Sequence, residues 1–189
     1  MIVHTPGIWF STLCLLVVSA PAHSAEPPLR VVPDVDYARY AGTWFEIARL
    51  PFRFQEDCAG DVTATYAPRP DGRITVTNRC RQPNGRMKEA EGVARRVQGR
   101  PPSVLEVRFA PAFLGFLPMV WGDYQVIALG EDYDYAVVGT PDRAYLWILS
   151  RTPHMETNTY DAVVAEAKSQ GFNVSALMKT RHSSTAPRH

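Results

Sequence analysis

The sequence lacks an excess of either charge. Its 189 residues carry 20 Lys+Arg against 19 Asp+Glu, a formal net charge of +1. Proteins that bind nucleic acid concentrate positive charge against phosphates, so no nucleic-acid partner is expected. The chain also lacks a glycine-rich phosphate loop and any spacing of acidic residues and histidines typical of metal ligands. We therefore expect neither a metal ion nor another cofactor.

Asp, Glu, Lys and Arg are absent from the first 25 positions. Residues 8–18 form an apolar run too short to cross a bilayer, and residues 19–25 are rich in alanine and serine. This order is typical of a secretory signal peptide cleaved between positions 22 and 25. The apolar run contains Cys14 after a leucine, which is not a lipid-attachment pattern. We expect a soluble exported protein, with a signal peptide over 1–25, one domain over 26–180 and a disordered tail over 181–189.

Cysteine is scarce, and only Cys58 and Cys80 remain after cleavage. Between them, two alternating β-rich runs at 61–66 and 73–78 flank the turn sequence of residues 68–72. Folding this hairpin about its central proline brings the two sulfurs close together, so we expect a disulfide in an oxidising compartment. The alternative is a pair of free thiols, one of them catalytic, although no histidine lies nearby in sequence to activate a thiolate.

Short β-rich runs separated by turn residues dominate the rest of the chain. Such links favour an antiparallel meander, either a barrel or a sandwich. One helix is expected from Glu156 to Ser169, with an apolar face, and Gly171 ends it. The predicted strands cover residues 42–49, 61–66, 73–78, 88–97, 103–109, 124–129, 135–138 and 145–150.

The first and last of these strands both combine a bulky aromatic residue with an arginine. Trp44 follows Gly42 in the first strand, and Arg151 directly follows the last strand. An arginine plane over an indole ring is favourable by about 0.5 to 2 kcal/mol. The pattern predicts one closed sheet in which Trp44 and Arg151 stack at the closed end.

The ordered set of motifs resembles the lipocalins, and in particular the bacterial lipocalins of the outer-membrane lipoprotein type, relatives of apolipoprotein D. The resemblance extends from Val35 to Met178. It implies an all-β fold, an eight-stranded antiparallel up-and-down β-barrel with a C-terminal α-helix packed outside. The matching segments are Gly42-Thr43-Trp44 with Glu46-Ile47-Ala48-Arg49, Val62-Thr63-Ala64-Thr65-Tyr66, residues 124–129 and residues 145–153.

Two features depart from that family pattern. The cysteine that anchors the bacterial relatives to lipid is missing after the signal peptide, so a lipid anchor is not supported. The second family signature remains only in part, as Asp132-Tyr133-Asp134-Tyr135. The resemblance still implies an exported protein of the periplasm, with association with the outer membrane as an alternative.

Period-two alternation, with the family pattern fixing the inward parity, assigns a lumen. The set is aromatic and mostly apolar, and its small members leave room for a ligand. Glu46 is the exception, because a buried carboxylate needs a partner or a raised pKa; a tyrosine hydroxyl, a lipid headgroup or a neighbouring strand are the alternatives. The competing interpretation of the whole set is a filled core. The predicted residues are Trp44, Glu46, Ala48, Val62, Ala64, Tyr66, Ala90, Gly92, Ala94, Leu105, Val107, Phe109, Tyr124, Val126, Tyr145 and Trp147.

Residues 111–121 are apolar without alternation, where a polar turn would be expected. The loop resembles those of plant temperature-induced lipocalins, which resemble membrane-contact devices. One hypothesis is that it touches a bilayer and helps a lipid enter or leave the lumen. A homodimer interface and a lid over the mouth are the alternatives. The residues concerned are Phe113, Leu114, Phe116, Leu117 and Trp121.

Together these features favour binding over catalysis. The predicted function is storage or transport of a small apolar or amphiphilic ligand, a fatty acid or lysophospholipid, for maintenance of the envelope. A lipocalin-type enzyme acting on lipid, an isomerase or reductase, is the main alternative. A haem or pigment carrier and a purely structural envelope module are the others; His154, the histidine nearest the barrel strands, is expected at the surface.

Overall fold

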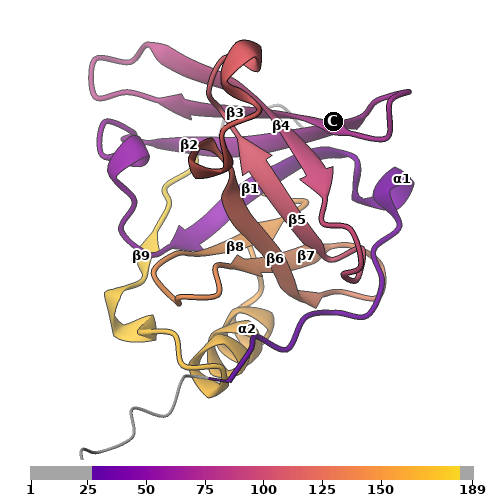
Figure 1. The fold of residues 1–189 in the computed structure, drawn as a ribbon. Coiled ribbons are helices and arrows are strands. Elements are labelled where there is room, and N and C mark those ends of the chain that lie inside the picture. Colours follow the sequence, from indigo (N-terminus) through magenta and orange to yellow (C-terminus); the bar gives the residue numbers. More distant parts are fainter. Residues whose placement is uncertain (1–26, 184–189) are drawn as a thin grey trace, which may run out of the picture.

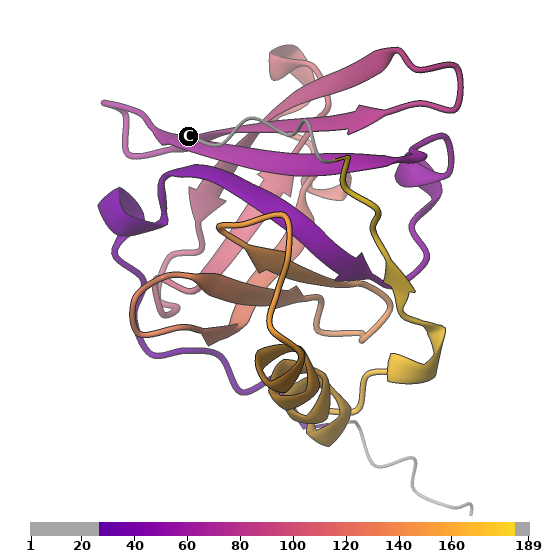
Figure 2. The same ribbon diagram turned by 180° about the vertical axis from the view of Figure 1, so that it is seen from behind.

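The computed structural model describes residues 27–183; the predicted signal peptide and residues 184–189 lie outside the described residues. One antiparallel sheet runs in the order β2-β3-β4-β5-β6-β7-β8-β1-β9, and β1 also pairs with β2. Eight strands therefore close into the predicted up-and-down β-barrel, with α2 against its outside (Figures 1 and 2). The elements are α1 (Tyr37–Tyr40), β1 (Gly42–Arg49), η1 (Arg53–Gln55), β2 (Gly60–Pro68), β3 (Ile74–Arg81), β4 (Met87–Arg96), β5 (Val104–Arg108), η2 (Ala112–Leu114), η3 (Pro118–Val120), β6 (Gly122–Leu129), β7 (Tyr135–Gly139), β8 (Leu146–Ser150), α2 (Thr157–Ser169), η4 (Val174–Ala176) and β9 (Met178–Lys179).

Tight polar turns join neighbouring strands, as their sequences predict. In the β2–β3 turn, the Asp71 carboxylate accepts a hydrogen bond from the Arg73 backbone N–H at 3.1 Å. Gly72 in the same turn has φ +76°, a left-handed conformation that costs glycine little. These local interactions fix the register of the hairpin, and the opposed Cys58 and Cys80 form the predicted disulfide.

A β-bulge in β1 changes which of its side chains face inward. Glu46 pairs with Leu149, but the next residue paired with β8 is Ala48, opposite Ile148. The extra residue, Ile47, reverses the alternation, because paired residues share a face of the sheet. Ala48 therefore packs outside the barrel with Ile148, Val163 and Ala167, in a group of buried residues that we call the outer apolar cluster. The prediction that Ala48 lies in the lumen is wrong. Arg49 takes the inward position opposite Trp147.

The outer apolar cluster joins α2 to the barrel. Val163 and Ala167 on α2 are buried against β-strand residues that include Ile148. Burying a valine side chain stabilises by roughly 1.5–3 kcal/mol, so this face holds the helix in place. The helix ends as predicted, with Gly171 at φ +93° just after it.

The C-terminal segment forms part of the barrel wall. β1 pairs with β2 only from Gly42 to Phe45, and beyond that point residues 178–183 lie between the two strands. The Thr180 N–H donates to the Ile47 carbonyl at 2.9 Å, and the Arg181 carbonyl accepts from the Asp61 N–H at 2.8 Å. Residues 181–183, which we expected in a disordered tail, are held by these bonds and by the Asp61 carboxylate.

Candidate ligand-binding site

The closed end of the barrel is built around Trp44 and Arg151. The Arg151 guanidinium carbon lies 3.9 Å from the centre of the fully buried Trp44 ring. The same guanidinium donates to the backbone carbonyls of Thr43 (3.1 Å), Arg39 (2.6 Å) and Tyr133 (3.2 Å). These bonds tie the start of β1 and the β6–β7 turn together beneath the lumen.

Gly42 belongs to the same arrangement. Its φ is +94°, and a Cβ at this position would lie 3.4 Å from an Arg151 nitrogen. Any other residue would be strained at this φ, whereas the contact of its Cβ with the guanidinium would be an ordinary one. The structure thus brings together the three residues that the sequence assigned to barrel closure.

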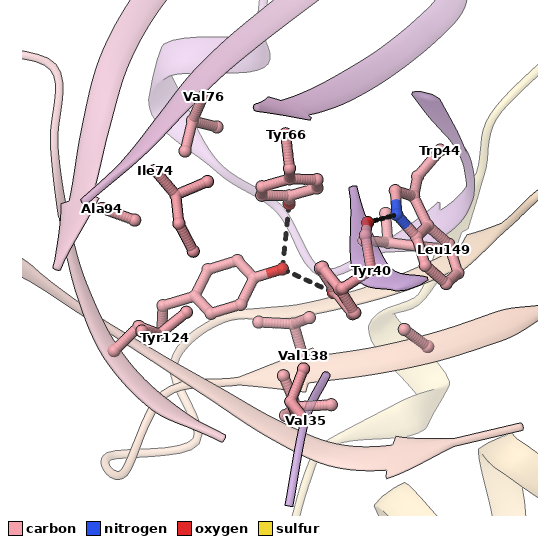
Figure 3. Close-up of a cluster of buried hydrophobic side chains, with 13 residues drawn as sticks. Val35, Tyr40, Trp44, Tyr66, Ile74, Val76, Ala94, Tyr124, Val138 and Leu149 are labelled. Atoms are coloured by element: carbon pink, nitrogen blue, oxygen red, sulfur yellow. Dashed lines mark hydrogen bonds between the residues drawn. The ribbon is translucent and has the colours of Figure 1, made fainter. Parts of the chain in front are cut away.

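Above Trp44, a chain of tyrosine hydroxyls crosses the lumen (Figure 3). The Tyr124 hydroxyl donates to Tyr66 at 2.9 Å, and the hydroxyls of Tyr40 and Tyr124 are 2.8 Å apart. Burial raises the pKa of Tyr66 to about 12 and that of Tyr40 and Tyr124 well above their ordinary value. All three therefore stay protonated at neutral pH and can donate hydrogen bonds.

The lower part of the barrel around these tyrosines is filled. Trp44, Ala94, Leu105 and Val126 all belong to one buried apolar cluster rather than to an open wall. Gly92 is covered, because a Cβ there would lie 2.7 Å from the Phe109 ring. These five predicted lumen residues are buried without lining the cavity, and the four in the cluster fill the lower half of the barrel.

The upper part of the barrel encloses a cavity of about 1010 Å³. This volume reaches the upper end of the range for small-molecule sites, roughly 300–1,000 Å³. Apolar and aromatic side chains make up most of its wall, while charged groups lie toward the mouth. The predicted lumen residues that line it are Glu46, Val62, Ala64, Tyr66, Ala90, Val107, Phe109, Tyr124, Tyr145 and Trp147.

Glu46 is only 3% exposed, and side chains of the protein itself satisfy it. Its carboxylate accepts from Gln55 at 2.7 Å and from the Thr180 hydroxyl, and Arg49 Nε lies 3.4 Å away. Burial raises its pKa, and the bonds from Thr180 and Gln55 offset part of that effect. Gln55 in turn accepts from the Trp147 indole at 3.1 Å. Glu46 therefore joins β1, the C-terminal segment and the mouth.

Residues 51–59, which we call the mouth segment, cover part of the opening. Phe52 packs edge-on against Tyr145 and Trp147, with ring centres 4.9 and 5.4 Å apart. The Cys58–Cys80 disulfide fastens the far end of the segment to β3. Sequence reasoning missed this part of the site; the aromatic spacing of Phe52 and Phe54 was the available signal.

The apolar loop 111–121 folds as two short 3₁₀ turns beside the mouth. Phe113 and Phe116 are 73% and 78% exposed, and Met119 is 85% exposed. Trp121 differs from them, because Arg95 and Arg108 lie 3.8 and 5.0 Å from its ring centre. Its indole N–H also donates to the Gly115 carbonyl at 2.9 Å. Trp121 thus anchors the loop and lines the cavity, whereas Leu114 and Leu117 are half-buried.

Other chemistry is sparse in the part of the chain that the structure describes. Residues 27–183 contain no group of three or more His, Cys, Asp or Glu that could hold a metal ion. Over the same range, no helix is both long and apolar enough to span a membrane. His154 is exposed in the loop after β8 and borders a small groove outside the barrel.

Comparison with known proteins agrees with this geometry. A family model described as a lipocalin-like domain matches residues 35–182. Temperature-induced lipocalin-1 of Arabidopsis thaliana is 42% identical over 161 residues, 84% of this chain and 86% of that protein. Outer membrane lipoprotein Blc of Escherichia coli K12 is 38% identical over 174 residues, 92% and 94% of the two chains. Lobster apocrustacyanin A1 has the same fold, with a TM-score of 0.64 at 14% identity, over 85% of this chain and 95% of that one.

Proposed function

The chain belongs to the lipocalin family, and from that premise we propose that it is exported and stores or carries a fatty acid or lysophospholipid for envelope maintenance. The observation that carries the proposal is the largely apolar cavity of about 1010 Å³. It lies above the buried cluster around Trp44, which fills the closed end of the barrel and which we call the floor. Burying roughly 300 Å² of hydrocarbon surface there contributes about 7 kcal/mol. The entropic costs of association subtract from this value, and the remainder suits reversible binding.

The mouth provides a place for a charged headgroup. Lys88 at the rim is paired with Asp57 at 2.8 Å, and Arg79 with Glu89 at 2.6 Å. Arg53, which also lines the mouth, lies over the Phe54 ring and has no carboxylate within ion-pair distance among the described residues. A carboxylate or phosphate that stays at the mouth while its chain enters the lumen can pair with this guanidinium.

The alternative functions have weaker support. Cys58 and Cys80 are joined in a disulfide, so residues 27–183 offer no free thiol for a cysteine-dependent isomerase or reductase. Neither His154 nor His182, the two histidines in the described range, lines the cavity, which argues against an axial haem ligand from these residues. An empty barrel in the purified protein would favour a structural envelope module instead.

Native mass spectrometry of the purified protein tests the proposal directly. We expect a bound species with the mass of one fatty acid or one lysophospholipid, released on denaturation. Protein that is uniformly free of lipid, and that takes up none when hexadecanoic acid is added, would contradict the carrier function.

The distribution of exposed apolar side chains supports contact with a lipid surface. Seven large apolar side chains are exposed in the described chain. Six of them lie on the mouth segment, at the end of the β3–β4 hairpin, in the loop 111–121 or at Phe109 just before that loop. Single exposed apolar residues are ordinary, but a cluster around one opening is typical of an interaction site. We therefore propose that the mouth docks on a membrane, where Phe113 and Phe116 insert.

Vesicle flotation of the wild type against Phe113→Ser/Phe116→Ser tests the docking. We expect the double variant to float much less, while Met178→Ser, which removes the exposed large apolar side chain of β9 outside these regions, floats like the wild type. Equal flotation of all three proteins would remove the membrane proposal. Loss of a dimer in light scattering, without loss of flotation, would favour the subunit interface.

A further inference from the structure

The three tyrosines at the floor of the lumen hold one more proton than their mutual hydrogen bonds can use. The geometry makes the Tyr124 hydroxyl the donor to Tyr66, at 2.9 Å. A phenol has a single proton, so Tyr124 cannot also donate to Tyr40. In the 2.8 Å bond between Tyr40 and Tyr124, Tyr40 must therefore be the donor. The Tyr66 proton is left over.

The leftover proton lies at the cavity end of this chain. Tyr66 is 6% exposed and lines the cavity, whereas Tyr40 does not line it. Among the described residues, no acceptor is bonded to the Tyr66 hydroxyl proton. The side chains clustered around it include Ile74, Val76 and Val138, which offer no oxygen (Figure 3). A buried donor without a partner is unfavourable, so an acceptor that reaches the floor gains from meeting it.

Among the described residues, the floor offers an ionised acceptor no free positive charge. Arg151, beneath the floor, lies against Trp44 and is bonded to three backbone carbonyls. Arg49 lies at the mouth end, where it donates to the Gln55 carbonyl and is paired with Glu46. A carboxylate or phosphate at the floor would lose its hydration in exchange for one neutral donor, which is strongly unfavourable. A ketone or ester carbonyl oxygen carries no net charge, so a single hydrogen bond from Tyr66 is enough to satisfy it.

We propose that the preferred ligand is an amphiphile whose acyl chain carries an uncharged carbonyl oxygen near its inner end, which accepts a hydrogen bond from Tyr66. The inference rests on the proposed lipid-carrying function and narrows its ligand class to oxygenated chains. The charged headgroup of such a ligand stays at the mouth beside Arg53, and the carbonyl fixes the depth of insertion.

Calorimetric titration of the delipidated full chain with hexadecanoic acid and a positional series of its keto derivatives tests the inference. We expect one keto position to bind about tenfold more tightly than the unsubstituted acid, as one net hydrogen bond allows. Equal affinity across the series would overturn the inference and leave the carrier function standing. No binding of any member would overturn both.

Three variants locate the donor. In Tyr66→Phe, the spare proton moves to Tyr124, 2.9 Å away and also on the cavity wall, so the preferred keto position should shift along the chain. In Tyr66→Phe/Tyr124→Phe, only Tyr40 remains, and the preference should disappear. Tyr40→Phe is the matched control, which keeps the Tyr66 donor and the wild-type preference. A double variant that folds and retains the preference would overturn the assignment.

Discussion

Replacing Arg151 with alanine should lower stability while leaving the lumen intact. The change removes three hydrogen bonds to backbone carbonyls and the contact of the guanidinium with the Trp44 ring at 3.9 Å. Each hydrogen bond from a charged group contributes about 1.5–3 kcal/mol and the ring contact about 0.5–2 kcal/mol, although water replaces part of this at a half-exposed site. We expect a net loss of about 3 kcal/mol in the free energy of unfolding.

Denaturant and thermal unfolding, with hexadecanoic acid titrated under native conditions, measure both effects. For a domain of this size, about 3 kcal/mol corresponds to a fall of roughly 6–12 °C in Tm. Arg151→Lys is the matched control, since lysine keeps the charge but cannot donate to three divergent carbonyls; it should recover less than half of the loss. Affinity should stay near wild type because the filled floor separates Arg151 from the cavity. An Arg151→Ala variant with unchanged Tm but no ligand binding would refute this reasoning.

Two further predictions concern the attachments of the mouth segment and the C-terminal segment. The double variant Cys58→Ser/Cys80→Ser opens a loop with a sequence separation of 22 and should lower the free energy of unfolding by about 3 kcal/mol. It should also weaken ligand binding. Denaturant unfolding and calorimetry measure the two effects, and unchanged affinity would show that the mouth segment is held without the disulfide. Burial alone would raise the pKa of Asp61, but hydrogen bonds from Ser183 and Arg81 hold it below its ordinary value. Its ionised form therefore stabilises the protein above the pKa of the unfolded chain, and this contribution is lost as the pH falls through the folded-state pKa. Asp61→Asn should be less stable than the wild type at neutral pH and equal to it in strong acid; a constant difference across the pH range would contradict the linkage.

The strand pattern could be predicted because it depends on local signals. Turn residues such as Asp71 and Gly72 specify hairpins, and alternation specifies which face of a strand is apolar. The closed end could also be predicted, because Trp44 on the first strand of the barrel and Arg151 directly after the last are unusual residues, and these two strands pair with each other. The short β9 carries no such pattern and is defined by its pairing with β1, so the sequence did not predict it.

The site itself was predicted only in part, for reasons that are not local. The bulge at Ile47 is set by pairing with β8, so alternation alone placed Ala48 inside and missed Arg49. The partners of Glu46 come from Gln55 and Thr180, which lie far from each other in the sequence and meet only after closure. The boundary between filled floor and open cavity depends on how side-chain volumes add up around the barrel, which period-two alternation does not encode.

Titration of the delipidated protein with hexadecanoic acid tests the central claim most directly, in the wild type and in two variants in which an alanine is replaced by phenylalanine. Ala64 lines the cavity and Ala165 is exposed on α2. We predict one site per chain in the wild type and in Ala165→Phe, and loss of binding in Ala64→Phe, or in Ala90→Phe if the first variant is unstable. Wild-type affinity in a folded variant with a blocked cavity would show that the lipid binds elsewhere and would contradict the account.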